Sequence, residues 1–156
     1  MITFPTISDR FHPGSIVTVK LIVDEAEKIM RAQSDTFAWF LRAKNLDGQT
    51  CLHEAVRHGH EDVVKYLVSK DADLGDVPLP LVQIVDNEGT SPLYLATTLR
   101  RDSIVKVLTE AAPSGMPRAA SYSGPAGKTA LHAAVLFSEG TNSVLCSLPS
   151  SARFIT

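Results

Sequence analysis

The nine residues GQTCLHEAV, at positions 48–56, decide the fold of this chain. They return as GTSPLYLAT at positions 89–97 and as GKTALHAAV at positions 127–135. In each copy a glycine is followed by a hydroxyl, a leucine and an alanine at fixed spacing, and the copies lie 41 and 38 residues apart. Self-similarity on this length scale is typical of a stacked repeat. The pattern therefore favours a binding surface over a closed catalytic domain.

Each copy predicts an amphipathic helix that begins after a hydroxyl. Thr50, Ser91 and Thr129 stand where a side-chain oxygen caps a helix by accepting a backbone N–H. Pro92 follows its cap at the first helical position, where its missing N–H costs nothing. Three residues of each copy share one helical face: Leu52, Ala55 and Val56, then Leu93, Ala96 and Thr97, then Leu131, Ala134 and Val135.

A second helix is predicted after the first two copies. Its apolar stripe contains Val63, Val64, Leu67 and Val68 in one copy and Ile104, Val105, Val107 and Leu108 in the next. Gly59 can supply the left-handed residue that ends the first helix. Arg100 stands at the equivalent position of the second copy, and arginine is uncomfortable at positive φ. We expect the turn in the second copy to be either different or strained.

The segment Thr50-Cys51-Leu52-His53-Glu54-Ala55 resembles the T-P-L-H-x-A signature of ankyrin repeats. The resemblance covers roughly residues 14–137 and implies an all-α fold, a helix-turn-helix solenoid with long connecting loops. The spacings of the copies exceed the ~33 residues of a standard ankyrin repeat. We expect the extra residues, at 75–86 and 111–126, to form surface loops.

Both ends of the repeat array are incomplete. Residues 14–31 align with a second helix, and the third copy has a first helix only. The expected segments are an irregular N-terminus (1–13), a half-repeat (14–44), two repeats (45–85 and 86–124), a half-repeat (125–137) and an irregular tail (138–156). Both ends would expose apolar helix faces. Another protein covers them, or the chain is marginally stable, or it is a truncated piece of a longer protein, the alternative that we favour.

A narrower resemblance rests on the spacers between copies. KNLDG at 44–48 and SYSGP at 121–125 look like the spacers of plant ankyrin proteins of the accelerated-cell-death type. That resemblance implies an ankyrin array followed by a C-terminal membrane region, and a role in defence and stress signalling. The membrane region has no counterpart in this sequence. The alternative function is therefore a fragment of a longer membrane-anchored ankyrin protein with no independent activity.

The composition excludes several other classes of protein. The net charge of −2 argues against a nucleic-acid binder, which would show a basic face. The most apolar run, residues 17–23, is short and interrupted by Lys20, whereas a membrane span needs ~20 apolar residues. The N-terminus lacks a signal-peptide pattern. We expect Cys51 and Cys146 to be reduced and the chain to be cytoplasmic.

The positions of the residues argue against two possible sites, a zinc site and a phosphate-binding loop. Cys51, His53, His58 and His60 invite a zinc site, but Cys51 and His53 point in different directions on one helix, and zinc needs about four convergent ligands. Residues 124–129 end like a phosphate-binding loop, yet the required glycine is replaced by Tyr122. We therefore expect no metal, no cofactor, no small-molecule substrate and no catalysis. An enzyme built on Cys51 or the histidines is the rival class.

Residues 35–43, DTFAWFLRA, predict a short additional helix capped by Ser34 or Asp35. We expect Trp39 to pack against the neighbouring repeat; the alternative is an exposed anchor for a partner, because tryptophan is enriched at interaction hot spots. The ankyrin resemblance implies a protein partner, bound by the hairpin tips and by the exposed side of the first helices. The implied surface residues are Lys44, Gln49, Glu54, Arg57, Glu88, Tyr94, Thr98, Lys128 and Ala133.

Overall fold

The chain folds as a row of helices. A computed structural model describes residues 16–30, 34–75, 79–110 and 121–138, and within these ranges it contains helices and no strand. The elements are α1 (Ile16–Met30), α2 (Ser34–Leu41), α3 (Cys51–His58), α4 (Glu61–Asp73), the 3-10 helix η2 (Leu81–Gln83), α5 (Pro92–Thr98), α6 (Asp102–Glu110), the 3-10 helix η3 (Pro125–Gly127) and α7 (Ala130–Ser138). The all-α prediction is confirmed.

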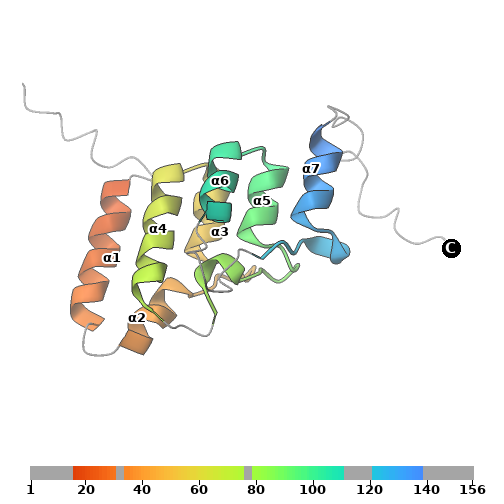
Figure 1. Ribbon diagram of the computed structural model, residues 1–156. Coiled ribbons are helices and arrows are strands. Elements are labelled where there is room, and N and C mark those ends of the chain that lie inside the picture. Colours follow the sequence, from red (N-terminus) through yellow and green to blue (C-terminus); the bar gives the residue numbers. More distant parts are fainter. Residues whose placement is uncertain (1–15, 31–33, 76–78, 111–120, 139–156) are drawn as a thin grey trace, which may run out of the picture.

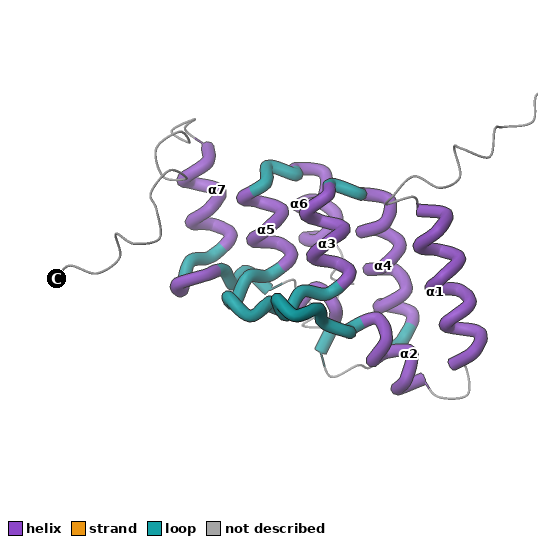
Figure 2. The backbone as a smooth tube through the Cα atoms, turned by 180° about the vertical axis from the view of Figure 1, so that it is seen from behind, coloured by secondary structure: helices purple, strands orange, loops and turns teal. Residues whose placement is uncertain are grey.

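The helices form two layers. The first helices α3, α5 and α7 pack side by side in one layer, and the second helices α1, α4 and α6 pack in the other. α3 also packs on α4, and α5 packs on α6, so each pair forms one complete repeat. The loops that join the repeats gather along one edge of the stack (Figure 2). α2 lies at that edge against α1 and α4.

The turns between paired helices keep one geometry in both complete repeats. Gly59 ends α3 in the left-handed region at φ 74°, and Arg100 adopts the same region at φ 54°. Both turns close with the same hydrogen bond at 2.9 Å, from His60 N to Ala55 O and from Arg101 N to Ala96 O. The second turn is therefore the strained alternative of the two that we expected, because a Cβ in this region is sterically unfavourable.

The core runs along the seam between the two layers. The first complete repeat contributes Leu52, Val56, Val64 and Leu67, each at most 1% exposed. The second contributes Leu93, Ala96, Ile104 and Leu108, each at most 2% exposed. The other members of the predicted stripes, Val68, Val105 and Val107, are half-buried against this core, and Thr97 is half-buried as well.

The third copy packs differently from the first. Leu131 and Val135 are 71% and 62% exposed, and Ala134 is exposed as well, whereas the residues at their registers in the first copy are buried. Ala130 and Ala133 are buried instead. The reason is that, among the described elements, α7 packs mainly on α5, so its covered face is the one toward α5. The expectation of an exposed apolar face at this end is confirmed.

The insertion after α4 is another correction. We expected residues 75–86 to form a surface loop, but Leu81, Val82 and Ile84 are buried. η2 packs against α4 and α5 and so extends the core between the two complete repeats. Most of the second insertion, 111–120, lies outside the described residues, as do residues 1–13 and 139–156.

The short helix predicted near residues 35–43 is present as α2, but the expectation for Trp39 is wrong. Phe37 and Leu41, one turn apart, are buried at 4% and 1% exposure. Trp39 lies on the other side of this helix and is 72% exposed. Its ring therefore does not pack into the neighbouring repeat.

Polar side chains hold α1 against α4. The Tyr66 hydroxyl donates a hydrogen bond to Asp24 Oδ1 at 2.6 Å, and Lys70 Nζ lies 2.6 Å from Glu27 Oε2 and 3.1 Å from Asp24 Oδ1. Burial and the bond to Asp24 raise the pKa of Tyr66 to about 12. The same bond, helped by Lys70, lowers the pKa of Asp24. These contacts fix α1 in the layer of second helices.

Candidate binding surface

The hairpin turns before α3 and α5 are built in the same way. Asn45 Oδ1 accepts hydrogen bonds from Asp47 N at 3.0 Å and Gln49 N at 2.9 Å. Asp86 Oδ1 accepts from Glu88 N at 2.9 Å and Thr90 N at 2.8 Å. Asparagine and aspartate favour such turns because their short side chains bond the backbone two residues on. The sequence analysis missed this role of Asn45 and Asp86, although both stand three residues before the glycine of their copies.

Hydrogen bonds join neighbouring hairpins to one another. Asn87 donates from its backbone to Asp47 O at 3.1 Å and from Nδ2 to Leu46 O at 3.0 Å. A Cβ on Gly48 would lie 2.8 Å from the backbone nitrogen of Asn87, so this close approach requires glycine. Lys44 Nζ donates to Val85 O at 2.7 Å. The hairpin tips therefore form a continuous, fixed edge.

His53 ties the first complete repeat to the second. Thr50 N donates to His53 Nδ1 at 3.2 Å, and the Thr50 hydroxyl lies 2.9 Å from the same atom. Because Nδ1 is the acceptor, Nε2 carries the proton, and it donates to Thr90 O at 3.1 Å. Burial lowers the pKa of His53, and the nearby charges of Lys44 and Arg57 lower it further. The buried neutral ring thus joins a helix cap to the next hairpin.

The second repeat meets the third copy through a different pair. Tyr94 occupies the register of His53, and its amide donates to Ser91 Oγ at 3.2 Å. Gly124 occupies the register of Asp86, and a Cβ on it would lie 2.3 Å from the Tyr94 ring. The backbone continues the contact, because Ser91 N donates to Ser123 O at 2.9 Å. Position 94 thus has a larger ring than His53, and position 124 has no side chain where the second copy has Asp86. The two differences occur at the same contact.

The nine predicted surface residues divide into three groups. Four are exposed, three are half-buried and two are buried. The exposed group is Lys44, Arg57, Glu88 and Lys128; the half-buried group is Glu54, Tyr94 and Thr98; the buried group is Gln49 and Ala133.

The two buried members correct the prediction. Gln49 is 9% exposed because its amide closes the Asn45 turn and its side chain lies inside the hairpin edge. Ala133 is 1% exposed because it faces α5. Tyr94 and Glu54 also differ from one another, since the Tyr94 ring covers Gly124 while Glu54 lines a cavity on the far side of α3. They do not form one binding patch.

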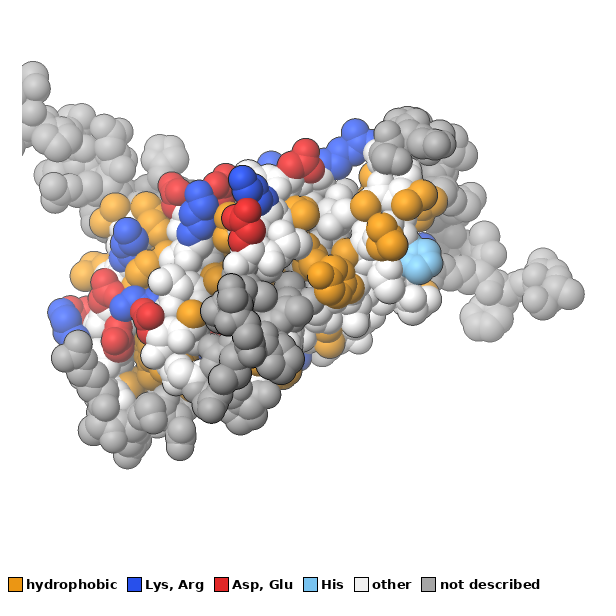
Figure 3. Space-filling model, viewed as in Figure 1, with side chains coloured by type: hydrophobic (Ala, Val, Ile, Leu, Met, Phe, Trp, Pro, Cys, Tyr) orange, Lys and Arg blue, Asp and Glu red, His pale blue; other side chains and the backbone are white. Residues whose placement is uncertain are grey.

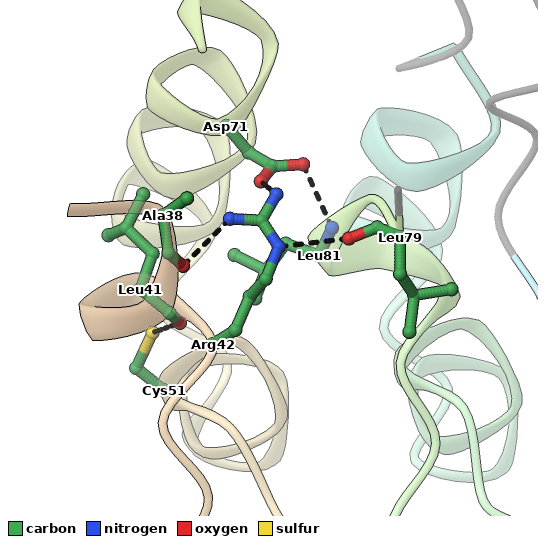
Figure 4. Close-up of polar contacts among 7 residues, drawn as sticks. All are labelled: Ala38, Leu41, Arg42, Cys51, Asp71, Leu79 and Leu81. Carbon is green, nitrogen blue, oxygen red and sulfur yellow. Dashed lines mark hydrogen bonds and ion pairs between the residues drawn. The ribbon is translucent and has the colours of Figure 1, made fainter. Parts of the chain in front are cut away.

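That cavity lies at the α1 end of α3. Its volume is about 440 Å³, and it is mostly apolar, with Val19 of α1, Ala55 of α3 and Leu67 of α4 among its lining residues. Cys51 stands at its edge with its sulfur directed to Leu41 O at 3.5 Å (Figure 4). Burial raises the pKa of this thiol, which disfavours the thiolate needed for nucleophilic attack.

A partly buried ion pair between Arg42 and Asp71, which was not predicted, contacts the insertion. The Arg42 guanidinium bonds Asp71 Oδ1 and donates to Ala38 O and Leu79 O, both at 2.9 Å (Figure 4). Asp71 Oδ2 accepts from Leu81 N at 2.8 Å. The pair thus joins α2, α4 and η2. The polar residues lie 29 positions apart, so no local pattern could reveal them.

The described residues contain no group of three or more His, Cys, Asp or Glu side chains that could hold a metal ion. His53 is committed to the Thr50 cap and to Thr90. His58 and His60 stack with their ring centroids 6.0 Å apart, and His58 Nε2 lies 3.6 Å from Glu54 Oε2.

Across the part of the chain that the structure describes, no helix is long and apolar enough to cross a membrane.

Comparison with known proteins assigns the repeat. The family model for ankyrin repeats (3 copies) matches residues 17–116 of the 156-residue chain. A search of curated proteins finds no match. The matched range covers α1 to α6, the region in which the caps, the left-handed turns and the paired helices recur. The chain belongs to the ankyrin-repeat family.

Proposed function

We propose that the chain is a non-catalytic protein-binding module whose hairpin edge and first helices contact a protein partner. The proposal rests on the fixed hairpin edge. There the polar side chains of Asn45, Asp86 and His53 form hydrogen bonds within the chain. The exposed side chains beside it then have a rigid base. Preorganised surfaces bind with a smaller entropic cost.

The proposed contact residues are the four exposed members of the predicted set, Lys44, Arg57, Glu88 and Lys128. Lys44 and Arg57 both lie near enough to His53 for their charges to lower its pKa. Glu88 lies at the tip of the second hairpin, and Lys128 precedes α7. Their mixed signs suit a partner with charges of both kinds at its contact surface.

A capture experiment with matched variants tests the proposal. One variant replaces Lys44, Arg57, Glu88 and Lys128 with alanine, and a control replaces Lys65 and Lys106 on the layer of second helices. Both variants make the net charge more negative by two. We expect partners captured by the wild type and by the control to be lost with the surface variant. Identical captured sets for all three proteins would refute the proposed surface.

The narrower identity remains a proposal from the spacers. The likeness of residues 44–48 and 121–125 to plant ankyrin proteins of the accelerated-cell-death type supports a role in defence or stress signalling, in the cytoplasm. A second candidate is a fragment of a longer membrane-anchored ankyrin protein with no independent function. The exposed apolar residues of α1 and α7 favour that candidate. Loss of stress responses in plants that lack the gene would support the first proposal.

A further inference from the structure

The two end helices are the two halves of one repeat. α1 is in register with α4, so that Ile16 corresponds to Glu61, and it is a second helix. α7 is in register with α3, so that Ser138 corresponds to Gly59, and it is a first helix. Figure 1 shows α1 and α7 at opposite ends of the stack. The described part of the chain therefore carries a first helix at one end and a second helix at the other.

Apolar residues that are buried between the two helices of a complete repeat have counterparts on α1 and α7, and those counterparts are exposed. In the first complete repeat, Leu52 and Val56 of α3 and Leu67 of α4 belong to one buried core cluster, with exposures of 0%, 0% and 1%. The residues at these registers are Leu131 and Val135 of α7 and Ile22 of α1. Their exposures are 71%, 62% and 55%. Figure 3 shows hydrophobic side chains at the surface at both ends.

The residues of α3 that line the cavity are those that would contact a preceding first helix. They are Cys51, Glu54, Ala55 and His58. Ala130 and Ala133 stand at the registers of Cys51 and Glu54, and in α7 they are the residues buried toward the preceding first helix, α5. The same side of α3 has no first helix against it among the described residues. Val19 and Leu67 complete the wall from α1 and α4.

We infer that the chain associates head to tail with a second copy of itself, with α7 of one molecule seated against α1 and α3 of the next. The junction would be a complete ankyrin repeat assembled from two chains. It buries Leu131 and Val135 of α7 toward Ile22 of α1, at the registers of the buried Leu52, Val56 and Leu67. Because the two contacting surfaces differ, the contact is head to tail and continues from copy to copy, either in an open row or until a ring closes.

A polar contact would fix the register of the junction. Thr129 and His132 repeat the cap of the first copy, with the Thr129 hydroxyl 2.8 Å from His132 Nδ1 and Thr129 N at 3.2 Å. His132 Nε2 therefore carries the proton, as in His53. The carbonyl at the register of Thr90 in the second copy is that of Gln49. His132 would donate to it and reproduce the bond that ties the two complete repeats.

Sedimentation velocity on two blocked variants tests the inference. Ile22→Glu closes the α1 end, and Leu131→Glu closes the α7 end; both sites are exposed, so the fold should remain, as far-UV circular dichroism will show. Val19→Glu and Val135→Glu form a second pair. The control is Leu46→Glu at a hairpin tip, where the side chain is 99% exposed.

We expect the wild type and the Leu46→Glu control to increase in average mass with concentration. Each blocked variant alone should remain a single chain. An equimolar mixture of the two should give a species of two chains and nothing larger, because one open α7 and one open α1 remain. A wild type that stays monomeric at every concentration would overturn the inference.

Three further outcomes would overturn it. Self-association of Ile22→Glu alone would mean that α7 ends bind each other, and self-association of Leu131→Glu alone would mean the same for α1 ends. A mixture that remains monomeric would show that the two faces do not fit. None of these variants alters Lys44, Arg57, Glu88 or Lys128, so the binding surface proposed above is tested separately.

Discussion

The buried side chain of His53 forms hydrogen bonds to two parts of the fold. Its ring accepts at Nδ1 from Thr50 and donates at Nε2 to Thr90, so one neutral imidazole satisfies a helix cap and a carbonyl of the next repeat. A protonated ring could not accept from Thr50 N. The bonds therefore require the neutral form.

The first prediction concerns the pH dependence of stability. The pKa of His53 is lowered from 6.5, chiefly by burial. The unfolded chain therefore takes up this proton at a higher pH than the folded chain does, and stability that is present above 6.5 is lost as the pH falls through and below that value. We expect His53→Gln to cost about 1–3 kcal/mol at pH 7.5, and to unfold with a weaker pH dependence. Urea unfolding at pH 7.5 and 5.5 measures both effects, and an unchanged pH dependence in the variant would contradict the assignment.

Arg100 gives the second prediction. Its left-handed backbone, at φ 54°, costs a residue with a Cβ roughly 1–2 kcal/mol relative to the right-handed region. Its side chain recovers part of that cost through an exposed hydrogen bond to Phe137 O at 2.8 Å. We expect Arg100→Gly to stabilise the protein by about 0.5–1 kcal/mol, since glycine is free of this strain and the lost bond is exposed. A lower urea midpoint for the variant would show that the bond to Phe137 outweighs the strain.

At the scale of the elements, the junction between α5 and the third copy depends on one close approach. The Tyr94 ring occupies the space that a side chain at 124 would need. We predict that Gly124→Ala destabilises the protein, and that the loss becomes smaller by at least about 1 kcal/mol when Tyr94 is also alanine. A double-mutant cycle in urea measures this coupling. Additive losses would mean that the ring can move aside without cost.

The Arg42–Asp71 pair gives the prediction for α2, α4 and η2. Removing one member of a buried ion pair leaves the other charge without compensation, which costs about 3–5 kcal/mol. We expect a loss of that size for Arg42→Met, and a smaller loss for Arg42→Met with Asp71→Asn, because the amide oxygen can still accept from Leu81 N. Urea unfolding compares the two. An Arg42→Met variant within about 1 kcal/mol of wild type would refute the structural role of the pair.

The elements also show what the sequence could and could not predict. Short-range signals, such as the cap at Ser91, the turn at Gly59 and the stripe from Val63 to Val68, predicted the helices of both complete repeats, and Thr129 predicted the start of α7. The insertion around Leu81 is bonded to Arg42 and Asp71, and Arg42 is far away in the sequence. The exposure of Trp39 depends on which side of α2 meets α4. Both facts follow from tertiary packing, which no local pattern contains.

The surface residues divide for the same reason. Lys44, Arg57, Glu88 and Lys128 are exposed as expected, because charged side chains are rarely buried without a partner. Gln49 and Ala133 were placed on the surface by alignment with the repeat alone. Their burial follows from the Asn45 turn and from the packing of α7 on α5.

For the whole molecule, stability is the sum of repeat stabilities and of the interfaces between neighbours. The two complete repeats have both kinds of contact, joined by His53, Asn87 and the η2 insertion. α1 and α7 each lack the helix that would complete their repeat within the described residues. The centre of the stack must therefore supply the stability that holds both ends.

The central claim is that the described helices form one continuous ankyrin stack despite these open ends. Urea unfolding followed by far-UV circular dichroism tests it most directly. We predict a strongly helical spectrum that is lost in a single cooperative transition, because every helix contacts its neighbours in the row. A weak helical signal that declines gradually, with no transition, would contradict the claim.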